Sequence, residues 1–332
     1  MPFISLVIPV YNGQHYLRAT LDSILAQTFE EWEAILVNDS STDDSLQVLN
    51  EYAAQDARFR VFTVPNGGAA AKATHFGIRQ MNPESRFFYY LSQDDILSPD
   101  LLQSMYERAA QTGAEVVVPD MVWYFESGEK PSTLPDFVGY HGDHDTLLDG
   151  QTAFCAANRY EVHGFALVSV DVVRRVGYFD FSYNSGDATM KLWMLAANRV
   201  AFSGGVFYYR QDNSAAITKK VSPQMFEVLQ TNEWMIDYLR EHYPQNAVVF
   251  RSAKKFQLDD MAGRQALLFR TRTFTPQVRK ELSQQLKQAY QSYRKTGAVR
   301  LPGLKGKVYS MLLNSGYWGF QCYVRWIFRH TL

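Results

Sequence analysis

The sequence YYLSQDDILSPDLL, residues 89–102, brings two neighbouring carboxylates, Asp94 and Asp95, to the end of a strand. The apolar run 87–91 predicts that strand, and Pro99 suits the first turn of a helix that follows the two acids. In an open α/β sheet, ligands bind beyond the carboxyl ends of the strands. The two acids therefore belong either to a site for a hard cation or to an ordinary polar loop, since Asp is common at turns.

Three apolar runs earlier in the chain predict three more strands. Residues 4–10, ISLVIPV, are apolar and β-branched almost without interruption, as in a strand that is buried on both faces of a parallel sheet. The runs 33–37 and 59–64 also predict strands, and residues with helical spacing separate the runs. Strands that alternate with helices predict a doubly wound parallel sheet. The predicted helices cover residues 14–27, 46–54 and 69–81.

Polar turns follow the four predicted strands, and the carboxyl ends of parallel strands meet at one edge of a sheet. These turns are Tyr11-Asn12, Asp39-Ser40-Ser41, Asn66-Gly67-Gly68 and Asp94-Asp95. A nucleotide would bind at this edge. No GxGxxG follows the first strand and no GxxxxGK[ST] is present, which argues against an ordinary dinucleotide fold and removes a P-loop. Without a glycine cradle, a divalent cation on Asp94 would neutralise the phosphates.

Three segments between residues 5 and 100 carry a resemblance to a known family. SLVIPVYNG, LVNDSSTDDS and LSQDDILSPD closely resemble, in order and spacing, the family two glycosyltransferases. The resemblance implies the GT-A fold, a Rossmann-like, mostly parallel sheet flanked by helices, and an inverting enzyme that uses a nucleotide-diphosphate sugar. It also implies a divalent cation, Mn²⁺ or Mg²⁺, held by Asp94. The positions that it assigns to the donor are Pro9, Tyr11, Asn12, Asp39, Ser41, Lys72, Gln93 and Asp94.

A second group of motifs lies between residues 164 and 210. A strand at 165–168, a Gly-Tyr-Phe-Asp turn, a helix at 188–198 and a strand at 200–209 resemble the second signature of the family. By this resemblance Asp187 is the catalytic base, and His163 and Gly186 line the acceptor pocket. One carboxylate suffices to take the proton of the acceptor hydroxyl during a single inverting displacement. On spacing alone, Asp187 suits the N-cap of the helix at least as well.

Several residues depart from the family pattern. Ser92 stands where an acid usually precedes the metal-binding Asp by two residues, and Gly186 replaces the Glu of a Glu-Asp pair. Thr74-His75 replaces an Arg-Asn pair, with Lys72 nearby as a substitute cation. These departures leave open a second interpretation, a catalytically weakened glycan-binding or scaffold protein of the same fold. A nucleotidyltransferase would instead show a Gly-rich, basic loop after the first strand, which is absent.

The segment between the two groups predicts a helix to about residue 111 and strands at 114–119 and 121–125. Residues 126–150 contain many Gly and Pro residues and predict a hairpin or a long loop. The cluster His141-Gly142-Asp143-His144-Asp145 lacks the spacing of a metal site, so a solvated loop near the acceptor explains it better.

The end of the chain differs in charge from the rest. Residues 251–332 contain 16 Lys and Arg against three acids, although the net charge of all 332 residues is −1. Residues 222–295 have the spacing of packed helices. Residues 305–329 interleave basic residues with Trp, Tyr and Phe, which suits either a membrane interface or a terminal helix packed on the body. No nucleic-acid-binding motif accompanies the charge.

These observations predict a GT-A domain at 1–215 and a mainly helical, basic region at 216–332 that associates with a membrane. Within the domain, residues 1–100 form the nucleotide-sugar half and 101–215 the acceptor half. The N-terminal run lacks the features of a signal peptide, no stretch is long and apolar enough to span a bilayer, and two cysteines suit a reducing compartment. The resemblance implies a role in sugar transfer to a lipid-linked glycan acceptor in bacterial surface polysaccharide assembly, in the cytoplasm or on the inner face of the membrane.

Overall fold

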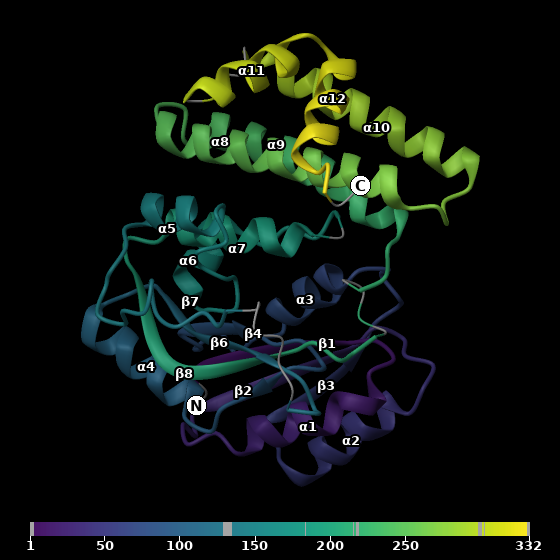
Figure 1. Cartoon of the computed structure of the whole chain (residues 1–332). Coiled ribbons are helices and arrows are strands. Elements are labelled where there is room, and N and C mark those ends of the chain that lie inside the picture. Colours follow the sequence, from purple (N-terminus) through teal and green to yellow (C-terminus); the bar gives the residue numbers. More distant parts are fainter. Residues whose placement is uncertain are drawn as a thin grey trace. The chain divides into compact units, whose positions relative to one another are not determined.

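The computed structural model of the chain describes residues 3–128, 135–182, 184–214, 216, 219–297, 301 and 303–330 (Figure 1). The chain divides into two compact units. Unit 1 consists of Met1–Phe181 and Ser185–Lys219, and unit 2 consists of Ser182–Asn184 and Lys220–Leu332.

Unit 1 is built on one mixed sheet, in which the described residues form eight strands in the order β3-β2-β1-β4-β7-β6-β8-β5. Strands β1 to β4 are parallel to their neighbours in this group, as predicted, while β7 is antiparallel to both β4 and β6. The strands are β1 (Ile4–Val10), β2 (Trp32–Asn38), β3 (Phe59–Thr63), β4 (Phe87–Tyr90), β5 (Ile96–Leu97), β6 (Val116–Tyr124), β7 (Leu167–Ser169) and β8 (Val200–Arg210). The predicted, mostly parallel sheet is confirmed.

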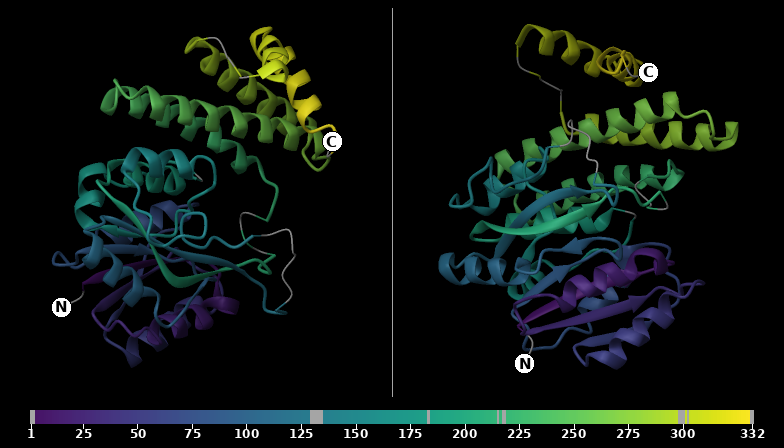
Figure 2. Two further views of the ribbon diagram at one scale, coloured as in Figure 1. Left: turned by 60° about the vertical axis from the view of Figure 1, so that its left-hand side comes forward. Right: turned by 60° about the horizontal axis from the view of Figure 1, so that its bottom comes forward.

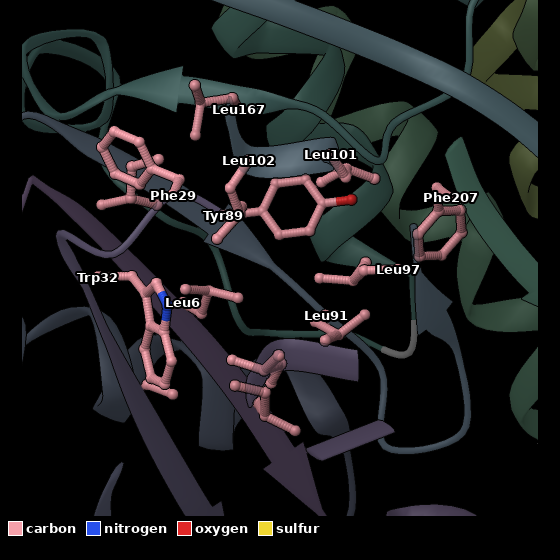
Figure 3. Close-up of a cluster of buried hydrophobic side chains, with 14 of the residues drawn as sticks. Leu6, Phe29, Trp32, Tyr89, Leu91, Leu97, Leu101, Leu102, Leu167 and Phe207 are labelled. Atoms are coloured by element: carbon pink, nitrogen blue, oxygen red, sulfur yellow. The ribbon is translucent and has the colours of Figure 1, made fainter. Parts of the chain in front are cut away.

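Helices cover both faces of this sheet (Figure 1). Successive side chains of a buried strand point to opposite faces, so β1 supplies Leu6 and Ile8 to one core and Val7 to the other. The first core, part of which Figure 3 shows around Tyr89 and Trp32, includes side chains of α1 (Gln14–Leu25), α2 (Ser45–Gln55) and α4 (Leu101–Thr112). The second includes side chains of α3 (Ala70–Ile78), α5 (Gly150–Ala157), α6 (Val170–Val176) and α7 (Ser185–Ala196).

Unit 2 is helical, as predicted (Figure 2). Its helices are α8 (Val228–His242), α9 (Ala247–Arg270), α10 (Pro276–Lys295), α11 (Gly303–Asn314) and α12 (Tyr317–Ile327). Leu286, Tyr290 and Phe320 are among the residues of its apolar core. None of the helices in the described ranges is long and apolar enough to cross a membrane.

Several element boundaries differ from the sequence-based expectations. Helix α4 begins at Leu101 after the N-cap Asp100, so Pro99 lies outside it. The two strands expected at 114–125 form the single strand β6, with an irregular register between Pro119 and Asp120. The helix at α5 and the short strand β5 were not expected. Both are brief, and short elements carry little periodicity.

Candidate functional site

Asn12 joins the turns that follow β1 and β2. Its backbone N–H donates to Ser41 Oγ at 3.1 Å, and its side-chain Oδ1 accepts from the N–H of Thr42 at 2.7 Å. Asn12 and Ser40 both have left-handed backbone conformations, with φ of 49° and 56°. Such conformations are uncommon outside glycine and often mark functional sites. The first two turns at this edge of the sheet therefore form one hydrogen-bonded unit.

Asp39 connects the turn after β2 with the turn after β3. The residue is buried, and its Oδ1 accepts from the backbone N–H of Gly67 at 2.8 Å. A Cβ placed on Gly67 would lie 3.0 Å from Cβ of Lys72, so the first turn of α3 packs closely against this loop. Lys72 itself is exposed. The structure thus brings Asp39, which the strand order predicted at this edge, and Lys72, which the resemblance suggested, to the same edge of the sheet.

Gln93 fixes the loop after β4 to the loop after β1. Its Oε1 accepts from the N–H of Tyr11 at 2.8 Å, and its Nε2 donates to the carbonyl of Tyr11 at 3.1 Å. The Tyr11 side chain is 48% exposed. Because both polar atoms of the Gln93 amide are used by one backbone segment, this side chain positions Tyr11 beside the edge of the sheet.

The two acids of the opening stretch have different environments. Asp94 is partly exposed, and its Oδ2 accepts from Asn213 Nδ2 at 2.6 Å. Asp95 is 1% exposed, and its Oδ1 accepts from the backbone N–H of Arg210 at 2.9 Å. Burial, and secondarily the charge of Asp94, raise the pKa of the Asp95 carboxyl well above its usual value. Asp94 is therefore the carboxylate available to a ligand, while Asp95 holds the end of β8.

Arg210, at the end of β8, is a structural residue in this arrangement. It is buried, its Nε donates to the carbonyl of Asp94 at 2.8 Å, and its guanidinium lies 3.3 Å from Asp212 Oδ1. The guanidinium also lies over the rings of Tyr16 and Tyr124, at 4.6 and 4.8 Å from their centroids. These contacts hold the Asp94 loop against β8.

The residues at the edge fit a cation that is shared with a substrate rather than one enclosed by protein. Across the described ranges, no group of three or more His, Cys, Asp or Glu side chains could hold a metal ion. Ser92 supplies a hydroxyl, whose Oγ donates to Tyr90 Oη at 3.3 Å, where the family usually has an acid. One carboxylate together with substrate phosphates is a common ligand set for Mg²⁺. Asp94 would supply the carboxylate of such a set.

A pocket of about 210 Å³ opens on the other half of unit 1. Its walls are mostly apolar and aromatic, and two charged side chains, Asp187 and Lys191, line it with His163. Tyr209 also lines the pocket, and the next residue, Arg210, holds the Asp94 loop. The remaining lining residues include Met121, Trp123, Phe137, Tyr160, Phe165 and Met190. Strand β8 therefore connects this pocket to the polar edge.

Asp187 lies in the first turn of α7 rather than at its N-cap, because the helix begins at Ser185. Its side chain is 56% exposed, and Oδ2 accepts from Lys191 Nζ at 2.8 Å. The Lys191 side chain is only 6% exposed. The four-residue spacing places the two charges on one face of the helix. Lys191 was not predicted, although that spacing from Asp187 was visible in the sequence.

His163 lines the pocket as a neutral imidazole. Its Nε2 donates to the carbonyl of Pro119 at 2.8 Å, and its Nδ1 accepts from the N–H of Phe165 at 3.2 Å. Burial lowers the pKa of His163 to about 4. Since both ring nitrogens are used by the backbone, His163 offers the pocket a ring surface rather than a proton donor.

Three of the residues that depart from the family pattern, Thr74, His75 and Gly186, lie around Tyr178. His75 Nδ1 lies 2.8 Å from Asp180 Oδ2, and the ring of His75 lies 5.7 Å from the ring of Tyr178. A Cβ on Gly186 would lie 3.1 Å from the Tyr178 hydroxyl, and that hydroxyl is hydrogen-bonded to Thr74. Tyr178 therefore links position 186 of α7 to positions 74 and 75 of α3.

The histidines and acids of residues 141–145 do not converge. His144 Nε2 lies 2.8 Å from Asp120 Oδ1, whereas His141 Nε2 lies 4.0 Å from Glu161. The two histidines of this loop therefore face different carboxylates. Asn213, which contacts Asp94, has no local signal in the sequence, because it lies 119 residues further along the chain.

Comparisons with known proteins identify the family of this chain. The family model described as "Glycosyl transferase family 2" matches residues 5–177. The glycosyltransferase GlyG of Streptococcus pneumoniae is 27% identical over 227 residues, which are 65% of this chain and 73% of GlyG. GlyA of the same organism is 32% identical over 169 residues, 50% of this chain, but the match covers only 23% of GlyA.

A solved structure has a similar fold over nearly the whole chain. Residues 1–349 of S. aureus TarS, crystallised in complex with UDP-GlcNAc, superpose with a TM-score of 0.70 at 14% identity. The match covers 99% of this chain and 92% of the TarS chain. This likeness shows the shared fold.

Proposed function

Since the chain belongs to glycosyl transferase family 2, we propose that it is an inverting enzyme that moves a sugar from a nucleotide-diphosphate donor to a hydroxyl of a glycan acceptor. One observation carries the proposal. The hydrogen-bonded edge with Asp39 and Asp94 and the pocket with Asp187 are joined through neighbouring residues of β8. A donor at the edge and an acceptor in the pocket would meet between them.

The donor is assigned to the polar edge of the sheet. Asp39 and the turns after β1 and β2 would bind the nucleoside, and Lys72 would face the diphosphate. Asp94 would hold a divalent cation, Mn²⁺ or Mg²⁺, which stabilises negative charge on the leaving diphosphate when it is bound. The donor-binding residues in this proposal are Pro9, Tyr11, Asn12, Asp39, Ser41, Lys72, Gln93 and Asp94.

Asp187 is the proposed base. In an inverting displacement the acceptor hydroxyl attacks the anomeric carbon from the face opposite the diphosphate and loses its proton as the bond forms. The Asp187 carboxylate accepts that proton, and Lys191 fixes one of its oxygens at 2.8 Å. The imidazole of His163 and the backbone at Gly186 border the acceptor. The aromatic walls of the pocket suit the apolar faces of sugar rings.

We infer that donor binding and acceptor binding are assigned to different parts of the chain. Residues 1–100 are the donor half, 101–215 the acceptor half, and 216–332 a separate helical region. We propose a role in bacterial surface polysaccharide assembly, for which the bacterial source of GlyG is the support, and with it a lipid-linked acceptor at the inner face of the membrane. The free cysteines Cys155 and Cys322 suit that reducing compartment.

The direct test is donor turnover. A panel of nucleotide sugars is incubated with Mn²⁺ or Mg²⁺, and the released nucleoside diphosphate is measured with and without glycan acceptors. We expect one donor to be hydrolysed slowly and transferred faster with its acceptor, and Asp187→Asn to abolish transfer. Asp171→Asn, which changes an exposed acid in the first turn of neighbouring α6, is the matched control. No turnover of any donor, with Asp187→Asn unchanged in every assay, would instead support the scaffold interpretation.

A further inference from the structure

Helices α11 and α12 each have a packed face and an outward face. Leu313 of α11 and Phe320, Tyr323 and Val324 of α12 are buried in the core of unit 2. One face of each of these two terminal helices is therefore packed within unit 2. The chain turns between the helices at Gly316, whose φ is 100°.

The outward face is unusually apolar for an exposed surface. On α11, Leu304 is 83% and Met311 is 74% exposed, and their spacing puts both on one side of the helix with Lys307. On α12, Trp318 is 71% and Trp326 is 44% exposed. These two helices supply six of the eight exposed large apolar side chains found in the described part of unit 2. Because α11 and α12 contact each other, this concentration of exposed apolar side chains on two neighbouring helices marks an interaction surface.

The charge of this region is of one sign. After Glu281 the sequence contains eight Lys and Arg residues and no Asp or Glu up to residue 332. Lys305 and Lys307 are exposed on α11 beside Leu304. We define the docking patch as Leu304, Lys305, Lys307, Met311, Trp318 and Trp326.

The combination of apolar and basic side chains selects the partner. Two copies of the patch would bring like charges together, which opposes self-association. A nucleic acid would be bound by the basic groups but would leave Leu304, Met311 and the tryptophans in water. An anionic lipid surface accommodates both the apolar and the basic side chains, because Trp and Leu enter the membrane interface while Lys contacts the charged headgroups.

We propose that the docking patch holds the chain on the surface of a membrane that contains anionic lipid. This deepens the proposed function, because a lipid-linked acceptor would lie on the surface to which the enzyme is bound. The binding itself requires neither donor nor acceptor, so it is measurable independently of catalysis.

The experiment is flotation of the full-length protein with vesicles of phosphatidylcholine, either pure or mixed with phosphatidylglycerol. We expect the protein to float with the mixed vesicles and to release as salt is raised. Lys305→Gln and Lys307→Gln should each weaken binding about fivefold. Met311→Ser with Trp318→Ser should weaken it by at least about tenfold and remove a blue shift of Trp fluorescence. Val248→Ser and Lys280→Gln, exposed positions on α9 and α10, should bind as the parent does.

Circular dichroism and vesicle-free donor hydrolysis show whether the variants remain folded. Equal flotation with pure phosphatidylcholine, or unchanged flotation of the folded patch variants, would overturn the proposal. So would a dimer in sedimentation that Met311→Ser dissociates. If a donor is turned over but the protein does not float, docking fails and the proposed function stands. If it floats but turns over no donor, the proposed function fails alone.

Discussion

Lys191 Nζ donates a hydrogen bond to Asp187 Oδ2 at 2.8 Å, one helical turn apart on α7. The lysine side chain is almost fully covered, while the carboxylate is more than half exposed at the pocket. A buried charge that lost its partner would be costly, so the pair holds the carboxylate in one position. This relationship distinguishes Asp187 from a simple acid at a helix start.

We predict that Lys191→Met lowers kcat for sugar transfer by about tenfold to a hundredfold without changing the KM for the donor. The reason is that Asp187 would lose the contact that orients it. Lys191→Arg should restore part of the rate. The measurement is steady-state kinetics at several donor concentrations. A rise in donor KM with unchanged kcat would assign Lys191 to donor binding instead.

The two acids of the β4 loop should respond differently to removal of charge. Asp94→Asn is expected to lower metal-dependent turnover by at least about a hundredfold, because the cation would lose its protein carboxylate. Asp95→Asn should retain turnover within about threefold, since an amide oxygen can still accept from the Arg210 N–H. Turnover is measured across a titration of Mn²⁺. Equal losses in both variants would contradict the separation of roles.

The stability of Asp95→Asn provides a second readout. The raised pKa of Asp95 means that the folded state holds its proton more tightly than the unfolded state, so ionisation at higher pH opposes folding. The parent should therefore lose stability relative to Asp95→Asn as pH rises from 4 to 8. Urea unfolding at several pH values measures the difference. A gap that is independent of pH would argue against a buried, protonated carboxyl.

His163 should produce the opposite pH dependence in the acid range. Its pKa of about 4 lies below the ordinary value of 6.5, so the unfolded state binds the proton first as pH falls. The stability from a neutral His163 is fully present above pH 6.5 and is lost towards pH 4. We expect about 2 kcal/mol less stability at pH 5 than at pH 7.5, in parent but not in His163→Gln. His15→Gln, an exposed position on α1, should behave as the parent.

Gly186 and Tyr178 should be energetically coupled. A methyl group at position 186 would lie 3.1 Å from the Tyr178 hydroxyl, which is closer than an ordinary van der Waals contact. We expect Gly186→Ala to be more favourable by about 1 kcal/mol in a Tyr178→Phe background than in the parent. A double-mutant cycle by urea unfolding measures this coupling. A coupling energy near zero would show that the hydroxyl yields to the new methyl group.

Local pattern was enough to predict much of this protein. The apolar runs at 4–10 and 33–37 identified buried parallel strands, because a strand covered on both faces needs apolar side chains throughout. The order of the polar turns predicts that Asn12, Asp39 and Asp94 lie at one edge of the sheet. Hydrogen bonds join Asn12 to Ser41, Asp39 to Gly67, and Tyr11 to Gln93, the residue before Asp94, so the structure brings these turns together. Short elements such as β5 were missed, since two residues have no period.

The resemblance already assigned the cation to Asp94 rather than to Asp95, but only the tertiary structure gave the physical reason, because the burial of Asp95 and its contact with Arg210 come from a strand more than 100 residues away in the sequence. The tertiary structure also determined that His163 is neutral, through backbone groups of Pro119 and Phe165. By itself, the sequence determined the strands, the charge of the C-terminal region and the resemblance to a family, all of which depend on neighbouring residues. The proton affinity, pairing and exposure of a side chain depend on the groups that surround it in three dimensions. Those groups come from distant parts of the sequence and are brought together only in the folded chain.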